Sequence, residues 1–556
     1  MSHPRIASGG AVGARGGSGK RDQVDGRYVP PKYAGPGRFG LGLFIAAVAG
    51  AAYYIWRSLA GDVADSGQIL STSAYVALAT ALVLALGFEF VNGFHDTANA
   101  VATVIYTKSL PPTVAVVWSG LWNFLGVAAS AGLVAYSIIG LLPVELILQV
   151  GTAAGYAMIF ALLVSAIFWN MFTWFFGVPN SSSHCLIGSV LGVGVANQLM
   201  APVGYATSGV DWGQAEKVAN SLFFSPLIGF TAAAILLLVL KAVASNPKLY
   251  REPEGDAPPP WWIRATLVTT CTAVSFAHGG NDGQKGMGLI MLILIGAAPA
   301  AFALNRAMPE AETAAIVRTL EATADLAATR AAGDAAQDPI AAREAVGAAL
   351  RAKDAAAGGL EANLAAIAAD AAQRIAAAGT IAAIPADETA ALRSDLYVVG
   401  EASKLLAKAG DMSAGERATY EKARDAAQSA TRYIPDWVKF GVAFALGLGT
   451  MVGWRRIVVT VGERIGKAHM TYGQGAAAET VAAVTILSAQ QFGLPVSTTH
   501  VLNSAVAGTM AANGSGLQWK TIGTLAGAWL ITLPVVITLS GGLYYVGMQL
   551  VRTLAG

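Results

Sequence analysis

Long stretches of apolar residues recur along the chain and are separated by shorter polar segments. Several reach the length of about 20 residues that an α-helix needs to cross a bilayer. Polar and apolar residues do not alternate within them, so a transmembrane barrel is not indicated. The pattern predicts an all-α polytopic membrane protein with about 10–12 membrane segments. The least ambiguous runs are residues 40–56, 74–90, 114–142, 153–176, 225–240, 440–452 and 525–550.

The composition supports this prediction. Of the 556 residues, 54% are hydrophobic and 13% are charged, whereas soluble proteins carry about 25% charged residues. Cys185 and Cys271 fall in or beside apolar runs and are expected to be packing residues rather than a disulfide. The first apolar run is long enough to remain as an anchor, so no cleavable signal is expected.

Basic residues indicate the topology. Residues 1–38 form a Gly-rich basic tail, and residues 248–264 and 454–467 form basic loops. By the positive-inside rule all three are expected to be cytoplasmic, with the N-terminus inside. We interpret these charges as signals for orientation in a lipid bilayer, and no nucleic-acid partner is expected.

Two pairs of motifs indicate an internal repeat. "FVNGFHD", ending at Asp96, aligns with "FAHGGND", ending at Asp282, and "PNSSSH" from Pro179 aligns with "PVSTTH" from Pro495. Asp96 precedes Pro179 by 83 residues, whereas Asp282 precedes Pro495 by 213, an excess of 130. Duplicated halves are a common construction of transporters, and the excess predicts an insertion in the second half.

A change in composition locates this insertion. Residues 303–433 are Ala-rich and hold 18 of the 34 acidic residues, in patterns that predict amphipathic soluble helices. Because one half enters its motif helix from outside and the other from a cytoplasmic loop, we expect inverted repeats and a periplasmic insertion. The expected parts are a tail (1–38), an extra membrane helix with an outer loop (39–72), a first repeat (73–245), a cytoplasmic loop (246–263), the start of a second repeat (264–302), the insertion (303–433) and the remainder of the second repeat (434–556).

Each Pro–Ser/Thr–His motif is expected to be the turn of a re-entrant helical hairpin. Proline ends one helix, and the hydroxyl residues can cap the next. The free N–H groups and positive dipole of the new helix, together with these hydroxyls, would form an anion pocket. Simple capping of two helices is the alternative. The candidate oxyanion ligands here are Ser181, Ser182, Ser183, Ser497, Thr498 and Thr499.

The Asp motifs supply the opposite charge. A lone carboxylate in mid-membrane costs about 2.5–3.5 kcal/mol, so Asp96 and Asp282 are expected either to bind a cation or to be satisfied by nearby Asn and backbone groups. Asn99, Asn281 and Gln284 offer further oxygen atoms for the site. The motif glycines are expected to break both helices, since broken helices in transporters expose such ligands to hard cations.

An oxyanion beside two carboxylates is stable only if a cation or a proton offsets the repulsion. The combined site therefore predicts co-binding of an oxyanion with a proton, sodium or a divalent metal such as magnesium, which describes a symporter. The motif histidines could carry protons near neutral pH or serve as packing residues, and Lys285 could pair with Asp282 or with the anion. The candidates for proton or cation coupling are Asp96, Asp282, His95, His184, His278, His500 and Glu479, with Asp96 and Asp282 as metal ligands.

These motifs resemble the signatures of the inorganic phosphate transporter (PiT) family. Its repeated Gly-x-Asn-Asp motif corresponds to "GFHDTANAV" and "GGNDGQKGM", and its hairpin motif to "PNSSSH" and "PVSTTH". The resemblance covers about residues 73–300 and 437–550. It implies inorganic phosphate as the substrate, inverted repeats, and roles for Asp96, Asn99, Asp282 and the hydroxyls of residues 181–183 and 497–499.

The strings "FHDTANAVATVIYT" and "AHGGNDGQKG" look most like the bacterial low-affinity branch of that family, which implies proton coupling and transport of a neutral metal-phosphate. Sodium-coupled members have Asn where this chain has His95, and tend to have Glu where it has Asn123. We therefore predict a proton-coupled phosphate symporter without a resident cofactor. Sodium coupling, transport of another tetrahedral oxyanion, an oxyanion channel and a homo-oligomer stay open. A metalloenzyme is not expected, because no HExxH-like spacing occurs.

Overall fold

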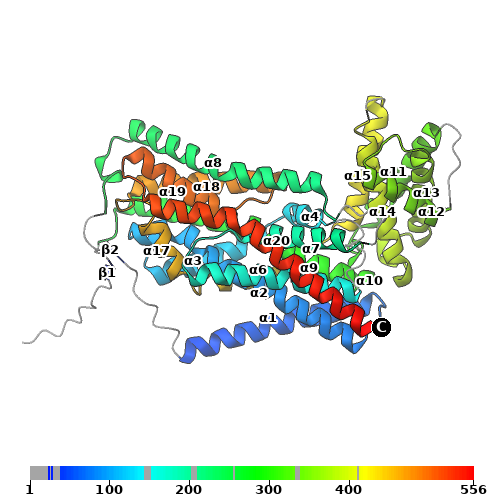
Figure 1. Ribbon diagram of the computed structural model, residues 1–556, viewed down its shortest axis with the longest axis horizontal. Helices are drawn as coiled ribbons and strands as arrows, with labels where there is room; N and C mark the ends of the chain where they lie inside the picture. Colours follow the sequence, from blue (N-terminus) through cyan, green and yellow to red (C-terminus); the bar gives the residue numbers. More distant parts are fainter. Residues whose placement is uncertain are drawn as a thin grey trace, which may run out of the picture.

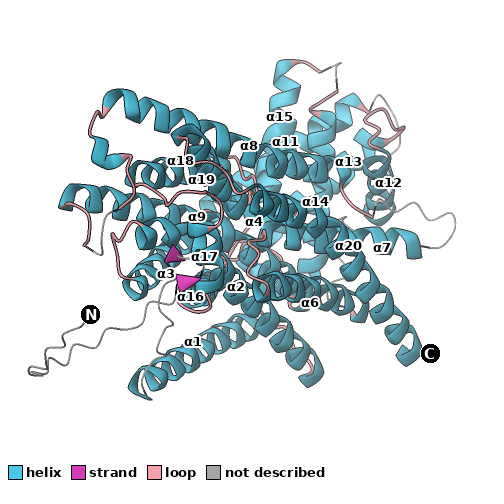
Figure 2. Cartoon of the chain, turned by 60° about the vertical axis from the view of Figure 1, so that its left-hand side comes forward, coloured by secondary structure: helices cyan, strands magenta, loops and turns pink. Residues whose placement is uncertain are grey.

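The computed structural model describes residues 23–24, 27–28, 38–142, 152–201, 209–253, 257–331, 338–409 and 412–555. These residues are helices and their connections, apart from one short antiparallel pair of strands, β1 (Gln23–Val24) and β2 (Arg27–Tyr28), as Figure 2 shows. The expected helical class is therefore observed. Most of the basic tail expected at 1–38 lies outside the described residues.

The apolar runs of the first half form long helices, but the run at 114–142 is divided rather than continuous. Its two parts, α3 and α4, meet at an angle of 76°, and Gly132 precedes α4 with a φ of +82° that other residues adopt only with strain. Pro226 lies inside α8. The helices are α1 (Arg38–Asp65), α2 (Thr72–Tyr106), α3 (Pro112–Ala128), α4 (Leu133–Ile139), α6 (Ala153–Phe175), α7 (Ser182–Met200), α8 (Trp212–Val243) and the single turn η1 (Pro247–Leu249).

The second half repeats this order of elements. Its bent pair, α16 and α17, meets at 66°, and Pro534 lies inside α20 as Pro226 lies inside α8. The order therefore aligns α2 with α9, α3–α4 with α16–α17, α6 with α18, α7 with α19 and α8 with α20. The helices are α9 (Trp261–Ala297), α10 (Pro299–Phe302), α16 (Asp436–Thr450), α17 (Arg455–Glu463), α18 (Tyr472–Gln491), α19 (Thr498–Asn513) and α20 (Trp519–Ala555).

Between α10 and α16 the chain forms a helical bundle with a hydrophobic core of its own, beside the long helices in Figure 1. Leu364, Leu396 and Tyr420 are fully buried in this core. The two ends of the bundle meet where the Asn305 N–H donates to the Ala430 carbonyl at 2.8 Å. The elements are α11 (Glu310–Arg330), α12 (Pro339–Ala352), α13 (Leu360–Ala378), the turn η2 (Ile381–Ala383), α14 (Ala386–Leu406) and α15 (Ala414–Thr431).

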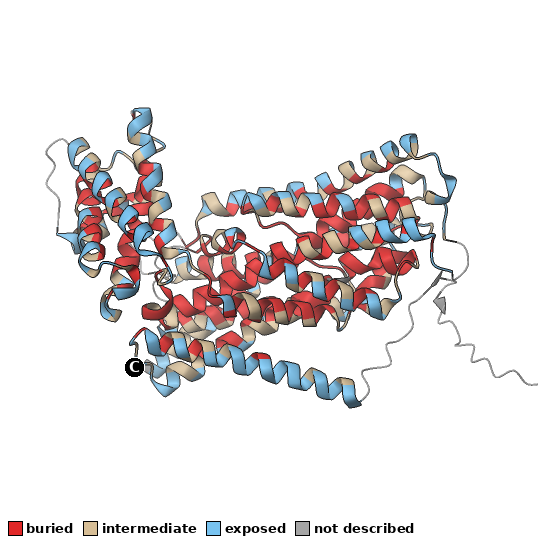
Figure 3. Cartoon of the chain, turned by 180° about the vertical axis from the view of Figure 1, so that it is seen from behind, coloured by how far each residue is buried: buried red, intermediate tan, exposed pale blue. Residues whose placement is uncertain are grey.

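Within the described residues, six helices are long and apolar enough to cross a membrane, and the two bent pairs raise this number to eight. This is fewer than the sequence led us to expect. Polar motif residues lower the hydropathy of α9, and α19 has only 16 residues. Figure 3 shows that burial is concentrated in the centre of the bundle, whereas α1 is largely exposed at its edge.

The two halves pack on each other in an exchanged pattern. α3 packs on α9 and α16 packs on α2, while α7 packs on α20 and α19 packs on α8. In the same way α6 contacts α2 and α20, and α18 contacts α9 and α8. Exchanging the two halves leaves this set of contacts unchanged, which is what two repeats related by an internal two-fold axis require.

The expected breaks at the Asp motifs do not occur, because both α2 and α9 continue through them. The glycines instead allow neighbouring helices to approach. A Cβ atom on Gly93 would lie 2.2 Å from the Leu446 carbonyl oxygen, and one on Gly279 would lie 2.1 Å from the Asn123 carbonyl oxygen. These glycines therefore hold α16 against α2 and α3 against α9, at equivalent places in the two repeats.

Candidate functional site

The carboxylates of Asp96 and Asp282 face each other where α2 and α9 pack together. Both side chains are buried, with residue exposures of 2% and 0%. The Ser182 hydroxyl lies between them, 2.9 Å from Asp96 Oδ2 and 3.3 Å from Asp282 Oδ2. The two motifs are distant in sequence, and the packing of the two halves brings them into one cluster.

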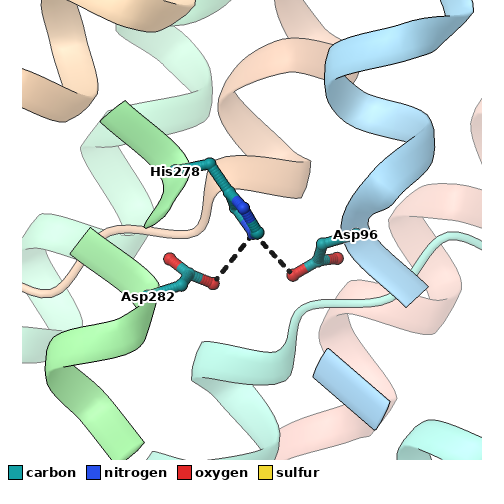
Figure 4. A group of neighbouring side chains, drawn as sticks. All are labelled: Asp96, His278 and Asp282. Atoms are coloured by element: carbon teal, nitrogen blue, oxygen red, sulfur yellow. Dashed lines mark ion pairs between the residues drawn. The ribbon is translucent and has the colours of Figure 1, made fainter. Parts of the chain in front are cut away.

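His278 completes a group of three side chains that could hold a metal ion. Its Nε2 atom lies 3.7 Å from Asp96 Oδ2 and 3.6 Å from Asp282 Oδ2, as Figure 4 shows. One ligand atom from each residue lies within 4.8 Å of the others. Carboxylate oxygens and an imidazole nitrogen suit a divalent first-row metal, and the carboxylates also suit magnesium.

The orientation of the His278 ring sets which of its nitrogen atoms faces the two carboxylates. Its Nδ1 atom lies 2.7 Å from Asn123 Oδ1, an acceptor, since Asn123 directs its Nδ2 to Ser119 and Thr450. Nδ1 therefore carries the hydrogen, and in the neutral ring Nε2 presents a lone pair to the two carboxylates. The Nε2 lone pair and the two carboxylates repel one another unless a proton or a metal ion lies between them.

The hydroxyl residues of the two hairpins divide into two kinds. Ser181 and Ser497 cap α7 and α19 by accepting from the N–H groups three residues later, at 3.1 and 3.2 Å. By contrast, the Ser182 and Thr499 hydroxyls donate to Asp96, Thr499 at 2.6 Å. Thr498 Oγ1 is buried and makes no hydrogen bond within the described residues. The N-termini of α7 and α19 thus both meet the Asp96 carboxylate.

Lys285 joins the Asp cluster to both hairpins. Its Nζ atom donates to Asp282 Oδ1 at 2.6 Å, to the Ser183 hydroxyl at 2.5 Å and to the Val496 carbonyl at 3.2 Å. The Ser183 hydroxyl itself lies 2.9 Å from the Val496 carbonyl. Lys285 is 1% exposed, so its charge is available only to groups inside this cluster.

Two other expected residues lie at the edge of the cluster. The His95 Nδ1 atom is 3.3 Å from Asp96 Oδ1, and its Nε2 atom is 3.4 Å from the Thr173 hydroxyl. Asn281 Nδ2 donates to the Leu494 carbonyl at 3.4 Å, whereas its Oδ1 atom is buried without a hydrogen bond in the described structure. The Asn99 side chain lies outside the described part of the structure.

The structure gives four other candidates different surroundings. Gln284 accepts from the Val134 N–H at 2.8 Å, so it holds the start of α4. The rings of His184 and His500 pack on each other at 4.4 Å. Glu479 accepts from Thr103 and Thr270, and Thr103 is seven residues beyond Asp96, about 10 Å along α2. None of these contacts directs the side chain at the Asp pair.

Glu89 is a buried acid of this region that the motifs did not reveal. It lies in α2 and has no exposed surface. Asn92 Nδ2 donates to its Oε2 atom at 3.4 Å, and its Oε1 atom has no hydrogen bond in the part of the chain described. The sequence did contain a signal for Glu89, which is an acidic residue inside the apolar run at 74–90. A carboxylate in such a run is energetically costly, and for that reason it indicates a functional residue.

The fold and the cluster together define a class of protein. Long helices in two repeated halves enclose a buried group of carboxylates, hydroxyls and one ammonium, with helix N-termini directed at it. Sites of this kind between repeats are characteristic of secondary membrane transporters.

Comparisons with known proteins identify the family. Residues 92–540 match the Phosphate transporter family. The chain is 40% identical over 505 residues to the low-affinity inorganic phosphate transporter PitB of Escherichia coli (strain K12), covering 85% of this chain and 97% of PitB. It is also 40% identical to PitA of the same organism, over 87% of this chain and 99% of PitA. The chain belongs to the phosphate transporter family, and is thus a multi-pass membrane protein for phosphate transport and not an enzyme.

Two further comparisons give lower identities. A probable low-affinity inorganic phosphate transporter of Bacillus subtilis (strain 168) is 27% identical over 84% of this chain and 95% of its own length. The solved structure titled "The sodium-dependent phosphate transporter" aligns with a TM-score of 0.47 and 19% identity, over 85% of this chain and 98% of that one.

Proposed function

We propose that this chain is a low-affinity symporter that imports inorganic phosphate, coupled to protons and largely as a neutral complex with a divalent metal such as magnesium. One observation carries the proposal. Lys285 contacts Asp282, Ser183 of the first hairpin and Val496 of the second, directly beside the group of Asp96, His278 and Asp282. An anion site and a cation site therefore share one buried cluster.

The charges of the cluster support co-binding. Two unit charges of the same sign 4 Å apart repel by about 4 kcal/mol at an effective dielectric constant of 20. Phosphate alone would meet Asp96 and Asp282 with only Lys285 to offset them. A divalent cation at these two carboxylates and His278 would reverse the local charge. Each solute therefore favours binding of the other, and such coupling is reciprocal.

Particular residues are proposed for each role. Asp96, Asp282 and His278 would hold the cation, while Lys285 and the hydroxyls of Ser182, Ser183 and Thr499 would hold the phosphate, together with the N–H groups that begin α7 and α19. The Ser182 and Thr499 hydroxyls, which here donate to carboxylates, would turn to the phosphate oxygens. By the family resemblance, Asn123 stands where sodium-coupled members tend to have a glutamate, and a neutral residue there removes one negative ligand, which supports proton coupling.

The arrangement in the membrane is part of the proposal. We infer that the repeats at 73–245 and at 264–302 with 434–556 are inverted and that one moves against the other to expose the cluster alternately to each side. The matched bent pairs and the exchanged contacts support related repeats. The chain would lie in a bacterial inner membrane with its basic tail inside and residues 303–433 in the periplasm.

Uptake of labelled phosphate into proteoliposomes tests this function, with proton, sodium and magnesium gradients varied separately. The expected result is accumulation driven by a pH gradient and increased by magnesium. Accumulation that follows only the sodium gradient would contradict the coupling, and flux indifferent to every gradient would indicate a channel. Competition by sulfate or arsenate measures the selectivity for the oxyanion.

Asp282→Asn tests the site. It is expected to abolish accumulation, because the neutral amide removes one cation ligand and the partner of Lys285. Glu216→Gln is the matched control, since Glu216 is an exposed acid of α8. Undiminished uptake by folded Asp282→Asn protein would contradict the proposed site.

A further inference from the structure

The buried acid Glu89 lies beside the cluster but belongs neither to the group of Asp96, His278 and Asp282 nor to the hairpins. We propose that Glu89 is the residue that carries the coupled proton across the membrane. This inference rests on the proposed proton symport and adds the group that binds the proton. Its carboxylate would take up a proton on the outer side as phosphate binds, and would release it on the inner side after phosphate leaves.

The Glu89 side chain packs against the backbone of α9 at a glycine. A Cβ atom on Gly286 would lie 2.4 Å from Glu89 Cγ and 2.5 Å from its Cδ and Oε1 atoms. The carboxyl group of Glu89 therefore rests on α9 at a glycine one turn beyond Asp282. It also lies seven residues before Asp96 on α2, which is two helical turns and the same helix face. Glu89 thus lies at the crossing of the two motif helices.

The hydrogen bonds of Glu89 differ from those of the two aspartates. Asp96 accepts from Ser182 and Thr499, and Asp282 accepts from Lys285. Glu89 accepts one long bond from Asn92, and its Oε1 atom has no hydrogen bond in the described residues. A buried carboxylate with a single distant donor is stable chiefly when it is protonated. Of the three acids, Glu89 is the least stabilised as an anion.

The charged groups that face Glu89 are Asp282 and Lys285 of α9 and Asp96 of its own helix. Several other helices pack on α2. Of these, α3 and α6 contain no Asp, Glu, Lys, Arg or His, and the charged residues of α16 lie in its first turn. Glu479 of α18 contacts Thr103, fourteen residues beyond Glu89 on α2. In α17, Arg456 lies over the Trp174 ring and Glu463 pairs with His469, while His500 of α19 packs on His184. Glu89 therefore responds to the cluster and to little else.

This position couples the proton to phosphate. A phosphate at Lys285 would pair with the nearest positive charge and so remove its stabilising effect on the Glu89 carboxylate, also when the phosphate enters as a neutral metal complex. This favours the protonated form of Glu89, and by reciprocity a proton on Glu89 favours phosphate binding. The step is a simple protonation of the carboxylate, so it needs no further reactant.

The second repeat shows that the fold itself does not need an acid here. In the aligned motifs Ser275 takes the place of Glu89, and its hydroxyl lies 2.9 Å from that of Ser119. The equivalent position is therefore filled by a small neutral residue in a helix of similar length. The acid is specific to one repeat, as expected for a single proton carrier in a two-fold arrangement.

Glu89→Gln in the full chain, reconstituted into proteoliposomes, tests the inference, with Glu216→Gln as control. Two quantities are measured: accumulation of labelled phosphate under a pH gradient, and exchange of labelled for unlabelled phosphate at equal pH. For the parent protein, a gradient of one unit coupled to one proton supports about tenfold accumulation. We expect Glu89→Gln to lose this accumulation and phosphate-induced proton uptake, while exchange stays within about threefold of the parent, since binding is kept.

Each other outcome overturns the inference. Normal accumulation in Glu89→Gln shows that another group carries the proton, and loss of exchange from folded protein shows that Glu89 binds substrate or holds the site. If Glu89→Gln does not fold, Glu89→Asp keeps a carboxylate, and an unchanged pH profile of its uptake contradicts the proposal. Failure of the parent protein to respond to a pH gradient would instead contradict the proposed function.

Discussion

At the scale of single residues, the cluster is governed by buried charge. Lys285 and Asp282 lie one turn apart on α9 with a contact of 2.6 Å, in surroundings where neither charge is stable alone. Lys285 also donates to Ser183 and Val496. The same side chain therefore compensates the charge of Asp282 and links the two hairpins.

Replacing Lys285 by Met tests this double role. Breaking a buried ion pair at one partner costs about 3–5 kcal/mol, so Lys285→Met is expected to lower the thermal stability of the purified protein and to abolish uptake. The double variant Asp282→Asn with Lys285→Met removes both charges and is expected to recover stability but not uptake. A single variant as stable as the parent would contradict the pairing.

A second residue-scale prediction concerns pH. In the bundle α11–α15, the Ser413 side chain and N–H, followed by Arg330, lower the pKa of Glu416 from 4.5 to about 2. Because the folded pKa is the lower one, this contribution to stability is complete above pH 4.5 and is lost as pH falls towards 2.

Thermal unfolding of the parent and Glu416→Gln, followed by circular dichroism, measures this effect. The parent is expected to be the more stable at pH 6, and the difference is expected to vanish as pH approaches the pKa of about 2. A difference that does not change with pH would contradict the assigned cause.

At the scale of elements, the glycines of the Asp motifs act through helix packing. We expected them to break the helices, but α2 and α9 are continuous. The sequence does not distinguish a glycine that breaks a helix from a glycine that allows a neighbouring helix to pack closely, because both are glycines in an apolar run. The partner helices α16 and α3, which are remote in sequence from the glycines they contact, make the distinction.

Gly93→Ala and Gly87→Ala form a matched pair for this packing. A methyl group on Gly93 would collide with Leu446 and Thr450 backbone atoms at 2.2 and 3.0 Å, whereas one on Gly87 meets nothing within 4 Å. Overpacking typically costs about 1–3 kcal/mol, so Gly93→Ala is expected to lower the melting temperature in detergent. Gly87→Ala on the same helix is expected to be neutral or slightly stabilising, and equal losses would contradict the explanation.

At the scale of the whole molecule, two repeats with exchanged contacts surround one site, and a separate bundle interrupts the second repeat. The Asn305 N–H to Ala430 carbonyl bond of 2.8 Å brings the ends of that bundle together. Arg306 also ties it to α10 by donating to the Ala300 carbonyl at 2.6 Å. Because the two ends of the bundle lie together, a short linker can span the distance between them.

Replacing residues 306–429 by a short Gly/Ser linker tests this independence. Because a short linker can bridge ends that already meet, uptake is expected to stay within about twofold of the parent. The measurement is labelled-phosphate uptake normalised to folded protein in the membrane. Loss of uptake by a correctly inserted deletion protein would show that the bundle contributes to transport.

The order of residues along the chain was sufficient to predict the helical membrane class, the repeated motifs, the interrupted second half and the candidates Asp96, Asp282, Ser182 and Thr499. These follow from local properties, since apolar length and motif identity are readable along the chain. The packing of the helices was needed to show that Ser182 and Thr499 meet the same carboxylate, that Gln284 holds α4 and that Glu89 lies at the crossing of α2 and α9. The physical reason is that such contacts join residues far apart in the chain, and their distances are set by the helix crossings rather than by any local pattern.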